Sequence, residues 1–295
     1  MPSLKLYHKL LVGMRVKQQR GLMARFLIYY LQMNAKADCC CLTVAGSDSG
    51  GNAGVQADLR VFHGYGLHGC TVLAALTAQN PRGVSAVHAV PPDFVAAQLD
   101  AVLGVYSICA LKTGMLSETP IVETVADRLA THSEIAKVID PVMIATSGAK
   151  LISDDAVDAL KRKLLPLATL VTPNLPEATA LCGHDAPAKE LAKRLQGDFG
   201  CAVLVKGGHG DGGDSVDILC DVSGEIHEFS LPRVENPIST HGTGCSLAAA
   251  LAAELALGHG LVDAVAGAKK FVHDAISASY LVGADCGVLG FAHGQ

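Results

Sequence analysis

The sequence predicts an α/β fold in which helices cover both faces of a mostly parallel sheet. From residue 39 onward, short apolar runs of strand length alternate with segments of helix length, which is the rhythm of β-α-β units. Hydrophobic residues make up 50% of the 295-residue chain and aromatic residues only 4%. We therefore expect a core of Ala, Val and Leu between stacked helices and buried strands rather than an aromatic-rich sandwich.

The predicted strands are six apolar runs at residues 41–45, 71–76, 110–115, 136–142, 169–173 and 202–206. Predicted helices begin at Asp93, Glu118 and Ser153 and after Gly244. Ser153 is a good N-cap because two acidic residues follow it in the first turn. Residues 214–230 break the alternation with two apolar runs around the turn VSGE, which predicts a hairpin at the sheet edge. With no linker or repeat after residue 39, residues 39–295 are expected to form a single domain.

Residues 1–38 are expected to be a basic N-terminal extension outside this fold. Residues 1–37 carry seven basic and no acidic side chains, whereas residues 38–295 carry 16 basic and 28 acidic side chains, a net charge of −12. This negative charge argues against a nucleic-acid partner. The extension's apolar run FLIYYL is too short to span a bilayer, so we expect no membrane partner. Two interpretations of the extension remain open: a targeting segment, or a chain that starts at Met33.

The ten cysteines are expected to be reduced core residues. None lies in a C-x-x-C pair, the chain shows no secretory signal, and the Cys and His positions form no zinc pattern. These observations predict a cytoplasmic protein.

Two glycine patterns match a dinucleotide fingerprint only in their letters. GYGLHG (64–69) lies between a predicted helix and a strand, and GHGDGG (208–213) lies between two predicted strands. The G-x-G-x-x-G fingerprint works only after a strand and before a helix, so both are expected to be turns. The chain also has no G-x-x-x-x-G-K-[ST] phosphate loop.

Two other glycine-rich stretches precede predicted helices. AGSDSGGNAG (45–54) follows the first strand, and HGTGCS (241–246) opens the alanine-rich segment. Free amides at a helix N-terminus bind anions, and glycine lets a ligand approach them. Lys206, at the end of a predicted strand, would supply a cation for phosphate. The alternative is that both stretches are ordinary tight connections.

Seven ordered blocks resemble a known family: AGSDSGGNAGVQADLR, ALTAQN, LKTGML, VIDPVM, TPNLPEA, VLVKGGHG and THGTGCSLAAALAA. In this order they are similar to the hydroxymethylpyrimidine and phosphomethylpyrimidine kinases of thiamine biosynthesis, in the ribokinase-like superfamily. The resemblance covers residues 41 to about 281. It implies a three-layer α/β/α ribokinase-like fold with a mostly parallel sheet. It also implies phosphorylation by ATP of 4-amino-5-hydroxymethyl-2-methylpyrimidine and then of its monophosphate.

The resemblance implies a catalytic element at Gly242, Thr243, Gly244 and Cys245. Backbone amides of this element would hold the transferred phosphoryl group, with help from Lys206, because phosphoryl transfer depends mostly on positioning and charge neutralisation. The thiol of Cys245 would accept the proton of the acceptor hydroxyl, as an Asp does in related sugar kinases. The helix N-terminus favours the thiolate and a triphosphate disfavours it. The alternative is that Cys245 is only a small residue at a helix start.

Other positions match the family's substrate contacts. Asp58 and Gln79 would hydrogen-bond the pyrimidine amine and ring. Apolar or backbone contacts to the flat ring are implied for Gly46, Met115 and Val142. Taken alone, Met115 would be interpreted as a core residue and Asp58 as a solvated helix residue.

Asn174 and Glu177 resemble an N-x-x-E element that holds Mg²⁺ largely through water, with Asn174 also near the phosphates. Asp140 would help to neutralise the ion; the alternative is a turn acid before Pro141. The chain departs from the family at Asn52, where a glycine is common, and in its tail, which matches only loosely.

The expected ligands are therefore ATP, Mg²⁺ and a small pyrimidine, and the family implies a homodimer. A pyridoxal kinase and a pyrimidine-binding protein without turnover remain as alternative functions.

Overall fold

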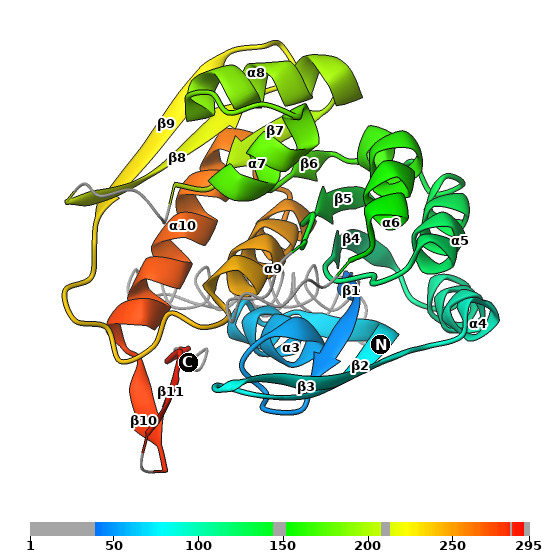
Figure 1. Cartoon of the computed structure of the whole chain (residues 1–295), viewed down its shortest axis with the longest axis horizontal. Coiled ribbons are helices and arrows are strands. Elements are labelled where there is room, and N and C mark those ends of the chain that lie inside the picture. Colours follow the sequence, from blue (N-terminus) through cyan, green and yellow to red (C-terminus); the bar gives the residue numbers. More distant parts are fainter. Residues whose placement is uncertain (1–38, 144–151, 208–212, 284, 292–295) are drawn as a thin grey trace, which may run out of the picture. The chain divides into compact units, whose positions relative to one another are not determined.

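The central feature of the fold is a nine-stranded sheet with the order β3-β2-β1-β4-β5-β6-β7-β8-β9 (Figure 1). This computed structural model describes residues 39–143, 152–207, 213–283 and 285–291. The predicted extension, residues 1–38, and most of the second glycine pattern, residues 208–212, lie outside the described residues.

Six neighbouring strands of the sheet run parallel, and all six were predicted. They are β1 (Cys40–Asp48), β2 (His68–Asn80), β4 (Ile108–Thr113), β5 (Ala136–Ile139), β6 (Leu170–Val171) and β7 (Ala202–Val205). Most of their buried side chains are apolar on both faces because helices cover both faces of the sheet. The doubly wound α/β prediction is confirmed.

Antiparallel strands close both edges of the sheet. The predicted hairpin is confirmed as β8 (Asp214–Cys220) and β9 (Ile226–Pro232). The opposite edge strand, β3 (Gly83–Ala89), pairs with β2 and was not predicted. A separate two-stranded ribbon, β10 (Tyr280–Val282) and β11 (Cys286–Val288), projects away from the main sheet (Figure 1).

The helices divide into two layers, one on each face of the sheet. One layer contains α3 (Gly54–Gly64), α9 (Thr243–Ala256) and α10 (Leu261–Ser277). The other contains α4 (Pro92–Leu103), α5 (Thr119–Leu129), α6 (Asp154–Ala159), α7 (Leu175–Cys182) and α8 (Ala188–Phe199). Within the described residues, no helix is long and apolar enough to cross a membrane.

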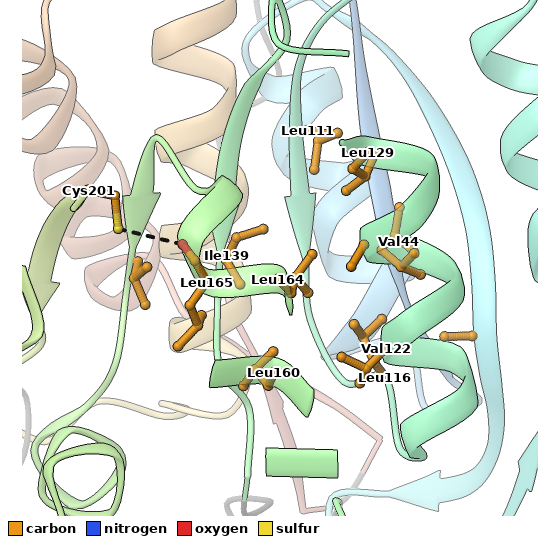
Figure 2. Close-up of a cluster of buried hydrophobic side chains, with 14 of the residues drawn as sticks. Val44, Leu111, Leu116, Val122, Leu129, Ile139, Leu160, Leu164, Leu165 and Cys201 are labelled. Carbon is orange, nitrogen blue, oxygen red and sulfur yellow. Dashed lines mark hydrogen bonds between the residues drawn. The ribbon is translucent and has the colours of Figure 1, made fainter. Parts of the chain in front are cut away.

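Each layer buries a separate apolar cluster. Figure 2 shows part of the larger one, in which Val44, Leu111 and Ile139 of the sheet meet side chains of α5 and of the turn after α6. The second cluster is rich in alanine, with residues 248–250 and 252–253 of α9 fully buried. Small side chains let α9 lie close to the sheet, which fits the low aromatic content.

Two local details differ from the predictions. Ser153 caps α6 as expected, since its Oγ accepts a hydrogen bond from the Ala156 amide. The helix then widens into a π-helical turn, η1 (Leu160–Leu164), and a 3₁₀ turn, η2 (Leu165–Leu167), instead of running on regularly.

In addition, Cys39 and Cys109 form a disulfide and are not the expected free thiols. Neighbouring strands place their Cα atoms 5.7 Å apart, within disulfide range.

The helices that precede the two sheet neighbours of β1 lie on opposite faces of the sheet. Helix α3 joins β1 to β2 on one face, and α4 precedes β4 on the other. Such a reversal opens a crevice at the carboxyl ends of the strands, where ligands bind in open α/β sheets. The topology therefore places the site at the edge where β1, β4, β5, β6 and β7 end.

Replacing Phe62 by Ala is expected to destabilise the fold strongly. Phe62 lies in the alanine-rich layer and is 0% exposed, so truncation leaves a cavity that costs about 3–5 kcal/mol. Urea unfolding measures the change in the free energy of unfolding. The matched control is Phe94→Ala in α4, where the side chain is 60% exposed. Equal losses in the two variants would contradict this assignment of the core.

Candidate active site

A cavity of about 810 Å³ opens at the carboxyl edge of the parallel strands. Residues from all six parallel strand ends and from the start of α9 line it. Twelve of the thirteen residues predicted for the site are among them: Gly46, Gln79, Met115, Asp140, Val142, Asn174, Glu177, Lys206, Gly242, Thr243, Gly244 and Cys245. The exception is Asp58. The topology thus gathers residues that are up to 199 positions apart in the chain.

The N-terminus of α9 presents unpaired amides to this cavity. No side chain caps the helix, and in the described part of the chain the amides of Gly244 and Cys245 have no hydrogen-bond acceptor. The Thr243 amide makes only a long contact, 3.4 Å, with the carbonyl oxygen of Thr240. Free first-turn amides carry the positive end of the helix dipole, so this terminus suits an anion.

Gly242 makes this open turn possible. Its φ is +87°, and a Cβ on it would lie 1.9 Å from the carbonyl oxygen of Asn52. Only glycine satisfies both conditions. The α9 turn and the β1–α3 loop are therefore in direct backbone contact.

The β1–α3 loop is not the second free anion site that the sequence suggested. Asp48 at the end of β1 fills it: Oδ1 accepts from the Gly50 amide at 2.8 Å, and Oδ2 accepts from Asn52 at 3.0 Å and Ala53 at 2.8 Å. Despite burial, the contacts with His241 and these amides lower the pKa of Asp48. The loop amides already hold the chain's own carboxylate, so the glycines here serve a tight connection.

Three charged side chains meet beside the α9 turn. Lys206 Nζ lies 2.7 Å from Asp140 Oδ1 and 3.9 Å from Glu177 Oε2. Burial opposes the charge of Lys206, but the two carboxylates outweigh it and raise the lysine pKa. A Cβ on Gly244 would lie 3.7 Å from the same Nζ. The ammonium therefore lies next to the free amides of α9.

Asn174 and Glu177 form a reciprocal capping box at the start of α7. Asn174 Oδ1 accepts from the Glu177 amide, and Glu177 Oε2 accepts from the Asn174 amide, both at 2.8 Å. This structural role was not anticipated for the pair. It also orients the Glu177 carboxylate toward Lys206. Burial raises the pKa of Glu177, and Lys206 opposes that rise.

Cys245 lies in the first turn of α9 and is partly exposed to the cavity. Burial raises the pKa of its thiol, while Lys112 and a hydrogen bond from the Gly54 amide act in the opposite direction. The sulfur is thus placed between the N-termini of two helices, α9 and α3. Because the net shift is upward, the thiol is protonated at neutral pH in the ligand-free protein.

Asp58 does not face the cavity, which corrects its predicted role as a ligand of the pyrimidine amine. The residue is 0% exposed, and its carboxylate accepts from Thr43 Oγ1 at 2.6 Å and from Lys112 Nζ at 2.9 and 3.0 Å. Helix α3 turns this side chain toward the sheet, where a buried lysine pairs with it. Both carboxylate oxygens are therefore occupied inside the protein.

One part of the cavity wall is apolar, with the amide of Gln79 in the same lining. Gly46 of β1 approaches Met115 so closely that a Cβ would lie 2.6 Å from the Met115 methyl carbon. Val142 and the amide of Gln79 line the same cavity. Met115 is 9% exposed, so it contributes both to the core and to the cavity wall. The Met115 methyl group therefore fills the space that a side chain at position 46 would need, and the two residues together form an apolar part of the cavity wall.

The other end of the cavity was missed by sequence reasoning. It is lined by apolar side chains of β9, the following loop and α10: Leu231, Val234, Pro237, Val272 and Ile276. Lys269 lies beside them and contacts Asp217 at 2.7 Å. Scattered apolar residues carry no pattern that marks a ligand site. Lys112 was missed as well, although a lysine inside the apolar run ALKTGM is a visible signal.

Comparisons with known proteins agree with this geometry. The model of the phosphomethylpyrimidine kinase family matches residues 48–290. The hydroxymethylpyrimidine/phosphomethylpyrimidine kinase of Escherichia coli is 47% identical over 80% of this chain and 90% of its own length. The bifunctional thiamine biosynthesis protein ThiED of Geobacter sulfurreducens is 49% identical over 80% of this chain. The chain spans about half (48%) of the length of that bifunctional relative.

Solved structures give the same relationship. A phosphomethylpyrimidine kinase from Clostridium difficile matches with a TM-score of 0.72 and 35% identity, covering 81% of this chain and 99% of its own. A pyridoxal kinase from Bacillus subtilis, in an ADP complex, matches with a TM-score of 0.77 and 34% identity, covering 86% and 97%. The fold is therefore ribokinase-like, and the chain belongs to the phosphomethylpyrimidine kinase family.

Proposed function

We propose that this chain phosphorylates 4-amino-5-hydroxymethyl-2-methylpyrimidine with ATP and then phosphorylates the resulting monophosphate. The observation that supports this best is the uncapped N-terminus of α9, with Lys206 and the Cys245 thiol beside it in one cavity. A protein that only bound the pyrimidine would need neither a free anion site nor a mobile cation. The apolar wall at Gly46, Met115 and Val142 would contact the ring, and the apolar side chains at Val234 and Val272 would contact the adenine.

The amides of Gly244 and Cys245 would bind the terminal phosphate, and Lys206 would neutralise part of its charge. Amides that are fixed before the reaction stabilise charge that develops on the moving group without reorganising. In the ligand-free protein Lys206 is held by Asp140 and Glu177. Phosphate binding would draw the ammonium away from them.

Asp140 and Glu177 would then hold Mg²⁺. Both carboxylates already lie around one cation, the Lys206 ammonium, and oxygen donors of this kind suit Mg²⁺, which keeps several of its waters. The ion would supply additional neutralisation of phosphate charge. Thr172 Oγ1 donates to Asp140 at 3.0 Å and fixes the direction of that carboxylate.

Cys245 would act as the base in the first transfer. The acceptor hydroxyl is neutral and must lose a proton, which the sulfur would accept as the oxygen attacks the phosphorus. In the second transfer the acceptor is a phosphate oxygen that is largely ionised already. The two steps therefore place different demands on the same residue.

A homodimer and a cytoplasmic location stay predictions for this chain. Five large apolar side chains on β2, β3 and β10 are 44–54% exposed, which supports an interface with a second copy: Leu76, Val87, Tyr280, Leu281 and Val282. Sedimentation velocity of the intact chain measures its oligomeric state.

Purified protein with ATP, Mg²⁺ and the aminopyrimidine alcohol is expected to release ADP, and removal of Mg²⁺ by EDTA is expected to abolish the reaction. Pyridoxal serves as the competing acceptor, because pyridoxal kinases share the fold. A higher kcat/KM for pyridoxal would transfer the assignment to that substrate. If neither alcohol led to ADP release, both kinase assignments would be refuted.

Cys245→Ala is expected to slow the first phosphorylation by about 100-fold or more, the usual effect of losing a general base. The second phosphorylation should lose much less. Each step is measured separately, starting from the alcohol or from its monophosphate. Cys182→Ala, which removes a partly exposed thiol of α7, is the control. Equal losses in both steps would contradict the base role.

The first step of the unmodified protein should also depend on pH. Burial raises the pKa of the Cys245 thiol above that of free cysteine, about 8.5. Since the thiolate forms only as the pH rises toward this value, the rate of the first step should increase between pH 7 and 9.

Lys206→Ala is expected to reduce the second phosphorylation at least as much as the first, by about 100- to 1,000-fold. The second step brings two anions together, and the variant leaves the carboxylates of Asp140 and Glu177 facing them without a cation. Steady-state kinetics with each acceptor measures this. Lys189→Ala, an exposed lysine paired with Glu228, is the control. A second step that is indifferent to Lys206 would remove this lysine from the phosphate site.

A further inference from the structure

Lys112 and Asp58 form an ion pair that is completely buried beneath the active site. Both side chains are 0% exposed, and Lys112 Nζ lies 2.9 and 3.0 Å from the two Asp58 oxygens. Thr43 Oγ1 donates to the same carboxylate at 2.6 Å. Burial opposes the charge of Lys112, but Asp58, Cys245 and Asp140 together outweigh it and raise the lysine pKa. The ammonium is therefore charged and fixed in place.

This ion pair and the Cys245 sulfur lie at the same site, since Lys112 and Asp58 both act on the thiol electrostatically. The Gly54 amide donates to that sulfur, and Asp58 follows Gly54 by four residues in α3. Residues four apart lie on the same helix face, and helical side chains lean toward the N-terminus. The Asp58 carboxylate and its lysine are thus beneath the α3 turn that contacts the sulfur. Lys112 also lines the cavity together with Cys245.

Stability of the fold is a weak explanation for a buried ion pair. Two charges taken out of water lose solvation that their mutual attraction repays only in part, and replacing such a pair by apolar residues is often neutral or stabilising. Apart from its register partner Thr43, Lys112 lies among apolar residues on this face of the sheet, among them Ala110 and Val138. A hydrophobic residue would suit that layer, so the ammonium points to a role in the chemistry.

The charges around Cys245 come from four elements. Lys112 on β4 favours the thiolate most among the charged groups, and Asp58 on α3 and Asp140 after β5 disfavour it. Lys206 after β7 also interacts with the sulfur. Lys206 is expected to turn to phosphate and Asp140 to the metal ion when ATP binds. Among these groups, Lys112 alone is a cation that no ligand draws away.

We propose that Lys112 is a positioning residue for the first phosphoryl transfer: its ammonium, fixed by Asp58 and Thr43, stabilises the thiolate of Cys245 that accepts the hydroxyl proton. This rests on the proposed base role of Cys245. In the step, the O–H bond of the acceptor breaks and an S–H bond forms. The acceptor oxygen bonds to the terminal phosphorus, and the bond from that phosphorus to ADP breaks. The proton leaves the sulfur for water after the product departs.

The test measures the ionisation of Cys245 in the ligand-free protein and does not depend on kinase activity. The rate at which iodoacetamide alkylates Cys245 is followed against pH, with the peptide that contains Cys245 quantified by mass spectrometry. Lys112→Met is expected to shift the profile to higher pH and to lower the rate at pH 8 by about 10-fold, since one pKa unit changes the thiolate fraction tenfold. The first phosphorylation should fall with it, and the second should change much less.

A second variant and a matched control keep this test decisive. Lys112→Met/Asp58→Asn leaves no unpaired buried charge and should still shift the profile upward, because Lys112 exceeds Asp58 in its effect on the sulfur. Lys137→Met removes another buried lysine, on β5, whose Nζ donates to the carbonyl oxygens of His132 and Ile135 on the other face of the sheet. That control should leave the profile unchanged.

An unchanged alkylation profile in the double variant would overturn the proposal, even if kinase activity fell. A shifted profile, together with a Cys245→Ala protein that keeps its first-step rate, would instead refute the base role of Cys245. The two failures are therefore distinguishable.

Discussion

The open N-terminus of α9 is the constraint on which the site depends. A helix that begins without a cap leaves its first amides unsatisfied, and buried amides need a partner. Here the turn is held by the positive φ of Gly242 and by its backbone contact with Asn52. Asp48 in turn fixes the β1–α3 loop that carries Asn52. The free amides can stay free because neighbouring elements, and not a capping side chain, fix the start of the helix.

The charged side chains at the carboxyl edge of the sheet form two ion pairs. The pairs differ in whether a bound ligand could replace one of the partners. Lys206 is paired with Asp140 at the cavity wall, at 12% and 2% exposure of their side chains, and we propose that an incoming phosphate and metal ion take over both partners. Lys112 and Asp58 are both 0% exposed, and of the two only Lys112 borders the cavity. In our proposal the first pair is replaced by ligands, whereas the second stays in place near the sulfur.

Much of this arrangement follows from the sequence because strand ends in a parallel sheet meet at one edge. Met115, Asp140, Asn174 and Lys206 each lie in or directly after a predicted apolar run, so their convergence follows from the strand order, while the roles of Met115, Asp140 and Asn174 were implied by the family resemblance. The catalytic element at the start of α9 is contiguous in the chain and was predicted from its glycines before a helix and from the same resemblance.

The parts of the site that the sequence did not predict correctly depend on contacts between separate elements. Whether Asp58 faced the cavity or the sheet depended on the rotation of α3 and on a lysine 54 residues away. For the first glycine stretch the sequence left an anion site and a tight connection open, and Asp48, which occupies the loop amides, favours the tight connection. The apolar end of the cavity is built from separate elements whose residues look like any core.

The most direct measurement of the central claim is the amide spectrum of the protein during titration with a non-hydrolysable ATP analogue and Mg²⁺. With ¹⁵N-labelled glycine and cysteine, the amide resonances of Gly244 and Cys245 should shift strongly as phosphate binds them. The Gly50 amide, already bonded to Asp48, should shift little. Large shifts at Gly50 with none at Gly244 and Cys245 would place the phosphate in the other loop and contradict the account.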